Sequence, residues 1–539
     1  MSDFLSILLV TSLIAPLALL GACFVRRWRG HALALQWLAP IPSLAAGLVG
    51  LNHAPLSYDL PFLGFTLRLD PPGALLLAGA ALLWIVVSAA LGSDRQPDSR
   101  FSICWLLTMI GNIGVFVAGD LVSFYLFYAF ASIPAYGLFA FSDDAERKRS
   151  GAIYMAFTIL GEALLLLAFA MLVRGEPHSS ARIVDVMDAL AASPWRNAAL
   201  GLIIAGFGMK IGMFPFNGWM PLTYSAAPIP AAALLSGAGV KAGVIGLIRF
   251  LPLAAPMESW GGVLATVGFL SAFYGVAFGL TQRNPKVILA YSSISQMGVI
   301  TAALGMALVH GQADASGNVA FYAANHLLVK ATLFLVIGAL AARGLKSSYT
   351  SLILVAVLAL SLAGLPLTGG ALAKLALKAQ FAGGSVAVLA TLSSIATALL
   401  MTHFLICLDV PPSGAAEECP ASLIRFWQAL ALGAILLPWA FYPAGANASS
   451  AFEFGNFLDG LWPVALGACL ALVLRRIGWF PPRVPVGDSI VLEEAAFRRL
   501  LSTGPSFETL DGHLRQWPVA GVSLLLIILV LLAASASGG

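Results

Sequence analysis

The sequence predicts an all-α membrane protein of about 14 to 16 transmembrane helices, since a helix needs about 20 apolar residues to cross the bilayer. Two observations predict this class. Of the 539 residues, 60% are hydrophobic and only 10% are charged, whereas soluble domains carry about 25% charged residues. Apolar windows long enough to cross a membrane also recur from one end of the chain to the other.

The windows amount to about sixteen candidate spans, with an uncertainty of about two. The polar stretch 477–516 comes before the last window and predicts a short amphipathic surface helix near 485–515, which we interpret as a docking surface. The candidate spans lie near residues 3–24, 31–51, 72–92, 101–118, 121–141, 150–173, 197–216, 222–252, 259–281, 285–308, 318–342, 350–382 (interrupted), 384–408, 422–442, 459–475 and 517–536.

The placement of basic residues predicts the orientation. Lys and Arg favour the cytoplasmic side of short loops, and here they gather after odd-numbered spans. The loops near 52–70, 253–258 and 309–317 contain almost none. We therefore expect an external N-terminus in a bacterial inner membrane. The loop 174–196 carries three arginines and is an exception that we still assign to the outside.

Charge and cysteine content exclude several other classes of protein. The net charge of +4 is small and lies mainly in the loops, which argues against a nucleic-acid partner. The five cysteines are scattered without a CxxC pair, so we expect no disulfide framework, metal site or iron–sulfur cluster. The sequence also contains no nucleotide fingerprint and no nucleophile–base arrangement. We expect no cofactor and no catalytic centre in this chain.

Three lysines inside apolar windows carry the strongest functional signal. Lys210, Lys241 and Lys374 each lie within a candidate span. A charged side chain at the centre of a membrane helix costs about 2.5 to 3.5 kcal/mol, so such residues usually mark an ion path. The sequence therefore predicts charge movement through the membrane.

Two of these lysines lie beside an interruption of their helix. Lys210 is followed by Pro215, Asn217 and Pro221. Proline removes a backbone donor and clashes with the preceding turn, so the helix must unwind and leave carbonyls free. At membrane depth, free carbonyls are tolerated only against protein or water. We therefore expect a polar cavity beside Lys210.

The second interruption precedes Lys374 and contains Gly364 and Pro366. It lies about five spans after the first. Paired interruptions in corresponding halves are typical of inverted-repeat transporters whose path runs near the bilayer midplane.

Five sequence runs carry a family resemblance: Lys210 to Pro221, Ala227 to Phe250, Ile288 to Gly298, His326 to Ala331, and Gly364 to Lys374. In this order they resemble the antiporter-like subunits of respiratory complex I. The same family includes subunits of Mrp-type cation/proton antiporters and of membrane-bound hydrogenases. The resemblance covers residues 100–410.

The resemblance implies a core of about fourteen helices containing two inverted five-helix repeats, each with a broken helix. It places N-terminal transmembrane helices at 1–100, the first repeat at 101–255 and the second at 256–410. The C-terminal helices and the surface segment then occupy 411–539. It also implies partners, namely other membrane subunits of a multisubunit complex. The chain could thus be a subunit of a quinone oxidoreductase-like or hydrogenase complex.

By position, the resemblance assigns Lys210 to the first broken helix, Lys241 to the next helix and Lys374 to the second broken helix. His326 and Lys330 match the central relay of the family. Simple chemistry agrees with this assignment. Burial favours the neutral form of an amine and a nearby carboxylate favours its charged form, so moving one acid can load or release a proton. His326 and Lys330 lie four residues apart, on one helix face.

The sequence departs from the family pattern in the relay. Ala129 stands where the family has a glutamate, so the usual partner of the first lysine is missing. Our hypothesis is that Glu162, on the next span, has become the partner of Lys210. Asn217 and Tyr322 each stand where the family has a histidine.

Several alternatives remain open at this point. The leading function is a proton-translocating subunit that moves protons through a Lys/Glu/His axis. The transported ion could also include Na⁺, in a sodium/proton antiporter. The chain could instead couple energy in an inorganic-carbon uptake complex, or be a non-conducting anchor in which the buried lysines only fix helix packing. Asp120, at a helix boundary, favours an N-cap over a relay role.

Overall fold

The computed structural model describes residues 2–60, 64–92, 99–141, 144–343, 349–408, 423–442, 448–478, 482–487 and 490. The chain divides into two compact units, Met1–Val486 and Gly487–Gly539. Nearly all of the second unit lies outside the described residues. The predicted surface helix near 485–515 therefore lies mostly outside the described residues, and the last candidate span lies wholly outside them.

The first part of the chain forms long apolar helices and one β-hairpin. The hairpin lies in the predicted loop 52–70 and pairs Leu56 with Leu69 and Leu60 with Phe65. Its short alternating pattern of apolar and polar residues is typical of a strand, and our all-helical prediction overlooked it. The elements are α1 (Ser2–Phe24), α2 (Arg29–Leu35), η1 (Gln36–Leu38), α3 (Ile41–Gly50), β1 (Leu56–Leu60), β2 (Phe65–Leu69) and α4 (Pro71–Gly92).

The stretch predicted as the first repeat forms a series of helices with a π-helical turn, η4, before its last helix. Asp120 caps α6 by accepting a hydrogen bond from the Ser123 backbone N–H at 2.8 Å, as its position predicted. The elements are α5 (Ser99–Val117), α6 (Leu121–Ser132), η2 (Pro134–Leu138), α7 (Ala145–Gly175), α8 (Ile183–Ala189), η3 (Leu190–Ala192), α9 (Arg196–Ile211), α10 (Trp219–Ala226), α11 (Ile229–Leu234), η4 (Leu235–Gly239) and α12 (Lys241–Phe250).

The stretch predicted as the second repeat is also helical, and two further helices follow it. The inverted relationship between the two stretches stays a prediction. The elements are α13 (Glu258–Leu280), α14 (Pro285–His310), α15 (Ala315–Arg343), α16 (Tyr349–Ser361), α17 (Gly369–Ala376), α18 (Gly384–Cys407), α19 (Leu423–Ala440), η7 (Ala448–Phe452) and α20 (Phe454–Arg476).

The multi-pass helical fold is confirmed. Among the described residues, 12 helices are long and apolar enough to cross a membrane. Three more of the predicted spans are occupied by the broken pair α9/α10, the broken pair α16/α17 and the shorter helix α19. The predicted span 222–252 was wrong at its start, because residues up to Ala226 belong to α10. Ala227 is extended, as expected for a residue that precedes a proline.

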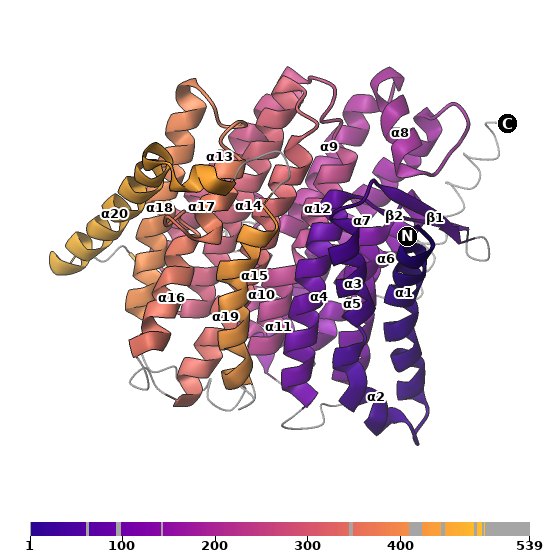
Figure 1. Cartoon of the computed structure of the whole chain (residues 1–539), viewed down its shortest axis with the longest axis horizontal. Coiled ribbons are helices and arrows are strands. Elements are labelled where there is room, and N and C mark those ends of the chain that lie inside the picture. The colour runs from indigo at the N-terminus through magenta and orange to yellow at the C-terminus, as the bar shows by residue number, and fades with distance from the viewer. Residues whose placement is uncertain are drawn as a thin grey trace, which may run out of the picture. The chain divides into compact units, whose positions relative to one another are not determined.

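Helices α12, α14 and α15 form the interior of the first unit. The spans that contain α12 and α14 are 100% buried and that of α15 is 94% buried, whereas only 28% of α1 and 22% of α20 is buried. In Figure 1, α12, α14 and α15 lie between the N-terminal helices and the group α16 to α20. Two of these interior helices carry Lys241 (α12) and His326 with Lys330 (α15).

Glycines let α13 and α14 approach closely. A Cβ on Gly268 would lie 2.4 Å from the Ala302 backbone nitrogen, and one on Gly298 would lie 2.5 Å from that of Ala272. Close backbone packing of this kind replaces the hydrophobic effect in holding membrane helices together.

A buried arginine joins three helices at one end of the bundle. Arg249 pairs with Asp70 at 3.1 Å and donates to the carbonyls of Phe116 and Ala118 at 2.7 and 2.9 Å. These carbonyls lie at the end of α5, where a cation is favourable. Arg249 therefore has a structural role in this fold.

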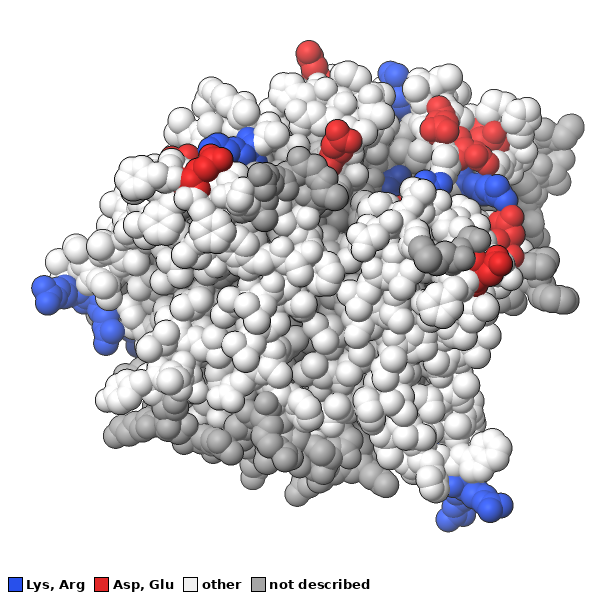
Figure 2. Space-filling model, in the orientation of Figure 1, with Lys and Arg blue, Asp and Glu red and all other residues white. Residues whose placement is uncertain are grey.

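On the face seen in Figure 2, charged side chains lie mainly at two opposite ends. Figure 2 shows acidic and basic side chains at the end that carries α8 and the hairpin, and a basic group at the opposite end, near α2. The face between them is uncharged apart from a basic group at the edge near the end of α20. This distribution fits a protein whose sides contact lipid, because exposed charges are costly there.

Candidate functional site

The structure places the predicted relay residues in three clusters. Lys210 lies on α9, near α6 and α7. Lys241, His326 and Lys330 form a central cluster between α12 and α15. Lys374 lies on α17, beside α18.

The first cluster forms around the amine of Lys210. Its Nζ donates a hydrogen bond to Ser132 Oγ at 2.7 Å. The amine also lies 5.6 Å from the ring centre of Tyr128 and 6.0 Å from that of Tyr154, within the range of cation–π attraction. These groups, together with Trp219, line a small cavity of about 10 Å³, which is about the space of one water molecule.

Glu162 lies close to Lys210 but makes no direct ion pair with it. Its carboxylate is buried, with 6% of the residue exposed, and its Oε1 has no hydrogen-bond partner within the described part of the chain. The hypothesis that Glu162 replaces the missing glutamate therefore stays a prediction. Ser132, three residues after Ala129, is the group that contacts the amine.

The first broken helix does not end as we predicted. We expected Pro215 to force the unwinding. Instead α9 ends at Ile211, because Gly212 adopts a left-handed conformation with φ of 69°. The Met213 N–H then bonds to the Gly208 carbonyl at 2.9 Å, a standard helix termination in which proline follows a few residues later.

The carbonyl freed at this break does not reach Lys210. The Met209 carbonyl accepts a hydrogen bond from the Trp219 indole at 2.8 Å. The predicted cavity exists, but it is formed by neighbouring helices and not by the break itself. Asn217 lies in the break and is fully buried, and its side-chain amide has no partner among the residues that the structure describes. Pro221 is buried inside α10.

The central cluster is completely buried. Lys241 Nζ lies 2.6 Å from His326 Nδ1 and donates to the Ser236 carbonyl at 3.1 Å. Lys330 Nζ donates to the Leu289 carbonyl of α14 at 2.8 Å. Lys241 and Lys330 have exposures of 0%, and His326 of 1%. His326 thus contacts Lys241 directly.

A π-turn creates the binding position of Lys241. The turn η4 runs from Leu235 to Gly239 and widens the helix just before Lys241. The carbonyl of Ala238 accepts from the Asn112 amide at 3.1 Å, and that of Ser236 accepts from Lys241. Such turns are frequent at functional sites. Sequence analysis missed it, although glycines at both 237 and 239 were a signal.

No acid pairs with the central cluster. Among the described residues, no ion pair involves Lys241, His326 or Lys330. A contact of 2.6 Å between an amine and an imidazole nitrogen requires one of them to donate and the other to accept. The two nitrogens therefore share a proton, and they cannot both be protonated at that contact.

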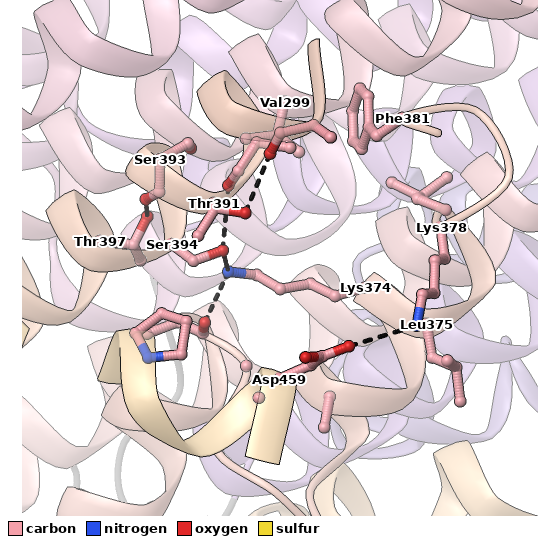
Figure 3. Close-up of a pocket in the computed structure, with 18 of the residues that line it drawn as sticks. Val299, Lys374, Leu375, Lys378, Phe381, Thr391, Ser393, Ser394, Thr397 and Asp459 are labelled. Carbon is pink, nitrogen blue, oxygen red and sulfur yellow. Dashed lines mark hydrogen bonds and ion pairs between the residues drawn. The ribbon is translucent and has the colours of Figure 1, made fainter. Parts of the chain in front are cut away.

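The third cluster surrounds Lys374 and opens into a large cavity. Lys374 Nζ donates to the Ala363 carbonyl at 2.5 Å and to Ser394 Oγ at 2.6 Å (Figure 3). Ala363 precedes Gly364 and Pro366, so here a carbonyl at the break binds the lysine. The cavity has a volume of about 570 Å³.

A polar chain extends from the cavity toward the central cluster. The Tyr322 hydroxyl donates to Gln296 Oε1 at 2.5 Å, and the Gln296 amide donates to Thr397 Oγ1 at 3.3 Å. All three side chains line the cavity of Lys374. Tyr322 precedes His326 by one turn of α15. Sequence analysis had noted Tyr322 only as a departure, and gave Gln296 and Thr397 no role.

A known protein family matches the part of the chain that holds the three clusters. The family described as "NADH:quinone oxidoreductase/Mrp antiporter, TM" matches residues 118–400. The chain belongs to this family. The resemblance inferred from the five sequence runs is thereby confirmed.

Two curated relatives carry antiporter names. A probable K⁺/H⁺ antiporter protein of Rhizobium meliloti is 32% identical over 355 residues, which cover 62% of this chain and 34% of that protein. A "Putative antiporter subunit mnhA2" of Staphylococcus aureus is 26% identical and covers 93% of this chain. The chain spans 34% and 63% of the lengths of these relatives.

Two solved structures share the fold. One is the Mrp complex from Dietzia sp., with a TM-score of 0.74, 20% identity, and a match to 99% of this chain and 63% of that one. The other is an archaeal membrane-bound sulfane sulfur reductase, with a TM-score of 0.65, 21% identity, and a match to 86% of this chain and 99% of that one. Both are described as complexes, and the second is described as a respiratory membrane complex.

Proposed function

We propose that this chain is a proton-translocating, antiporter-like subunit of a multisubunit membrane complex. The contact between Lys241 and His326 carries the proposal. Lys241 and His326 share one proton in a fully buried place, and Lys330 lies one turn from His326. Because like charges repel, a proton that arrives at one of these three groups favours the release of a proton from another.

The other two clusters support a path through this centre. Lys210 and Lys374 each hold an amine against a hydroxyl, and a hydroxyl can both accept and donate a proton. Tyr322 and Gln296 extend from the cavity of Lys374 toward His326. We propose that Glu162, Lys210, Lys241, His326, Lys330 and Lys374 are the relay residues, in that order along the path.

The names of the relatives favour one branch of the family. Both curated relatives are described as antiporter components, and one of them as part of a K⁺/H⁺ antiporter. We therefore place this chain in a cation/proton antiporter complex of the Mrp type, with other membrane subunits as its partners. The basic residues of the loops favour a bacterial inner membrane with an external N-terminus.

Proton flux in vesicles tests the proposal. The complex is purified through this chain, reconstituted, and loaded with a pH indicator, and a K⁺ or Na⁺ gradient is then applied. We expect the gradient to drive proton movement, and Lys210→Ala and Lys374→Ala to abolish it. Lys148→Ala is the matched control, because Lys148 is exposed outside the three clusters.

Each alternative predicts a different result. Unchanged flux in both variants, with normal assembly of the complex, would establish a non-conducting anchor. Proton movement that responds to bicarbonate and not to either cation would favour coupling to inorganic-carbon uptake. Proton movement driven by an electron donor, with no response to the cations, would favour a redox-driven complex.

A further inference from the structure

The cavity beside Lys374 contains a second lysine and a carboxylate that the relay does not include. Lys378, one turn after Lys374, pairs with Asp459 of α20 at 3.3 Å and with Asn456 at 2.8 Å. Lys374, Lys378 and Asp459 all line this cavity. Figure 3 shows Asp459 among the residues that line this cavity, with its drawn contact directed to Lys378.

Asp459 is the acid available to Lys374. Among the described residues that line the cavity, Asp459 carries the only carboxylate. The amine of Lys374 now bonds to a hydroxyl and a carbonyl, which are both neutral acceptors. A carboxylate in the same cavity would bind the protonated amine far more strongly than either of them.

The backbone of α20 packs closely against the break that holds Lys374. A Cβ on Gly460, the residue next to Asp459, would lie 3.2 Å from the Gly364 carbonyl oxygen. A Cβ on Gly364 would in turn lie 2.8 Å from Cδ and 3.6 Å from Nζ of Lys374. Gly364 therefore lies between α20 and Lys374. Neither Gly364 nor Gly460 has a side chain that would block Asp459 from approaching the lysine.

The present pair of Asp459 is easily exchanged. The Lys378 and Asp459 side chains are 61% and 68% exposed. Exposed ion pairs add little net stability, because water solvates both partners when they separate. Turning the Asp459 side chain from Lys378 to Lys374 at the mouth of the cavity therefore costs little free energy.

We propose that Asp459 is a switching counter-ion that alternates between Lys378 and Lys374. This role rests on the proposed function. When Asp459 pairs with Lys374, it holds a proton on that amine. When Asp459 returns to Lys378, Lys374 keeps only neutral partners, and its proton passes to water in the cavity. The C-terminal helix α20 thereby takes part in transport at the second broken helix.

Zero-length crosslinking tests the geometry independently of transport. A carbodiimide joins a carboxylate to an amine that it contacts, and mass spectrometry of the intact complex in membranes identifies the linked pair. We expect an Asp459–Lys378 product in the wild type. In Lys378→Gln we expect an Asp459–Lys374 product as the main one. Its absence from both proteins would overturn the switch.

Proton flux tests the role. We expect Asp459→Asn to lower flux about tenfold, a change of about 1.4 kcal/mol in the barrier, because Lys374 then lacks a carboxylate that can hold its proton. Glu453→Gln is the matched control, because Glu453 lies six residues earlier and does not line the cavity. Its flux should equal that of the wild type.

A charge-exchanged variant distinguishes a carboxylate that takes part in transport from one that only forms a structural ion pair. Lys378→Asp combined with Asp459→Lys keeps an ion pair but turns a second cation toward Lys374. The switch predicts that flux stays low, and restored flux would overturn it. Normal flux in Asp459→Asn beside lost flux in Lys374→Ala would also overturn the switch and leave the proposed function intact. Unchanged flux in Lys374→Ala would overturn both.

Discussion

The two broken helices hold their lysines in opposite ways. Lys210 turns away from its own break and bonds to Ser132 of α6, while the freed Met209 carbonyl bonds to Trp219. Lys374 turns back to its own break and bonds to the freed Ala363 carbonyl. The same sequence feature, a lysine beside a Gly/Pro interruption, therefore gives two different sites.

The surroundings differ as much as the contacts. The cavity at Lys210 holds about 10 Å³ and is lined by aromatic rings, whereas the cavity at Lys374 holds about 570 Å³. Aromatic faces attract a cation without water, and a large cavity solvates it with water. We interpret the first site as the dry end of the path and the second as its wet end.

The largest expected effect concerns the second break itself. A Cβ on Gly370 would lie 1.6 Å from the Ser361 carbonyl oxygen, in rigid backbone. Gly370→Ala should cost about 4 kcal/mol or more, among the largest effects of single substitutions. In the first break, Gly212→Ala should cost about 1 to 2 kcal/mol for its left-handed conformation, because a Cβ there meets mainly the flexible end of Met220. Thermal unfolding in detergent measures both, and equal losses would contradict the comparison.

The next largest effects are expected when each of the two lysines is removed, and a small amine should rescue only one of the two variants. Lys210→Ala and Lys374→Ala should each reduce flux about a hundredfold, as expected when an essential proton carrier is removed. External ethylamine should restore a part of the flux to Lys374→Ala, because the 570 Å³ cavity admits it. It should not restore Lys210→Ala, whose cavity holds about 10 Å³. Rescue of both variants would show that the two sites are equally open to water.

Glu162→Gln should have a smaller effect, confined to the first site. The carboxylate is buried and its Oε1 has no hydrogen-bond partner in the described structure, so we expect the loss of its negative charge to lower flux about tenfold, a change of about 1.4 kcal/mol in the barrier. Glu146→Gln, on the first and exposed turn of α7, is the control. Flux at the wild-type level in Glu162→Gln would remove Glu162 from the path.

The smallest effects should come from the two hydroxyls. Ser132→Ala removes the one hydrogen-bond acceptor of Lys210 in the described structure, whereas Ser394→Ala leaves the Ala363 carbonyl on Lys374. A hydrogen bond contributes about 0.5 to 1.5 kcal/mol net, so we expect a loss of about twofold to tenfold for Ser132→Ala and less for Ser394→Ala. Flux measured side by side gives the order, and a reversed order would contradict our interpretation of the two sites.

Much of the fold could be predicted from the sequence, because a membrane helix is defined locally. An apolar run of sufficient length has to form a helix in lipid, where every backbone group must bond internally. Most of the long helices therefore follow the predicted windows, whereas α8 lies in a predicted loop and α10 lies partly in the window 222–252. The presence of the two breaks was also predictable from their glycines and prolines, although α9 ends at Gly212 and Pro221 lies inside α10.

The candidate site could be predicted only in part. The sequence determined which ionisable residues lie inside the membrane, because Lys210, Lys241, His326, Lys330 and Lys374 all fall within apolar windows. It could not determine which of them touch. His326 meets Lys241, which lies 85 positions away, and Ser132 meets Lys210 across 78 positions. Contacts of this kind depend on helix packing, for which spacing along the chain gives no signal.

The sequence by itself thus determined the class of the protein, its buried charges and its two helix breaks. The tertiary structure alone decided which groups bind each amine, how large each cavity is, and that α20 brings Asp459 to the cavity of Lys374. The physical reason is the range of the forces involved. Burial and backbone bonding act within one helix, whereas a shared proton requires two side chains from different helices to lie within about 3 Å.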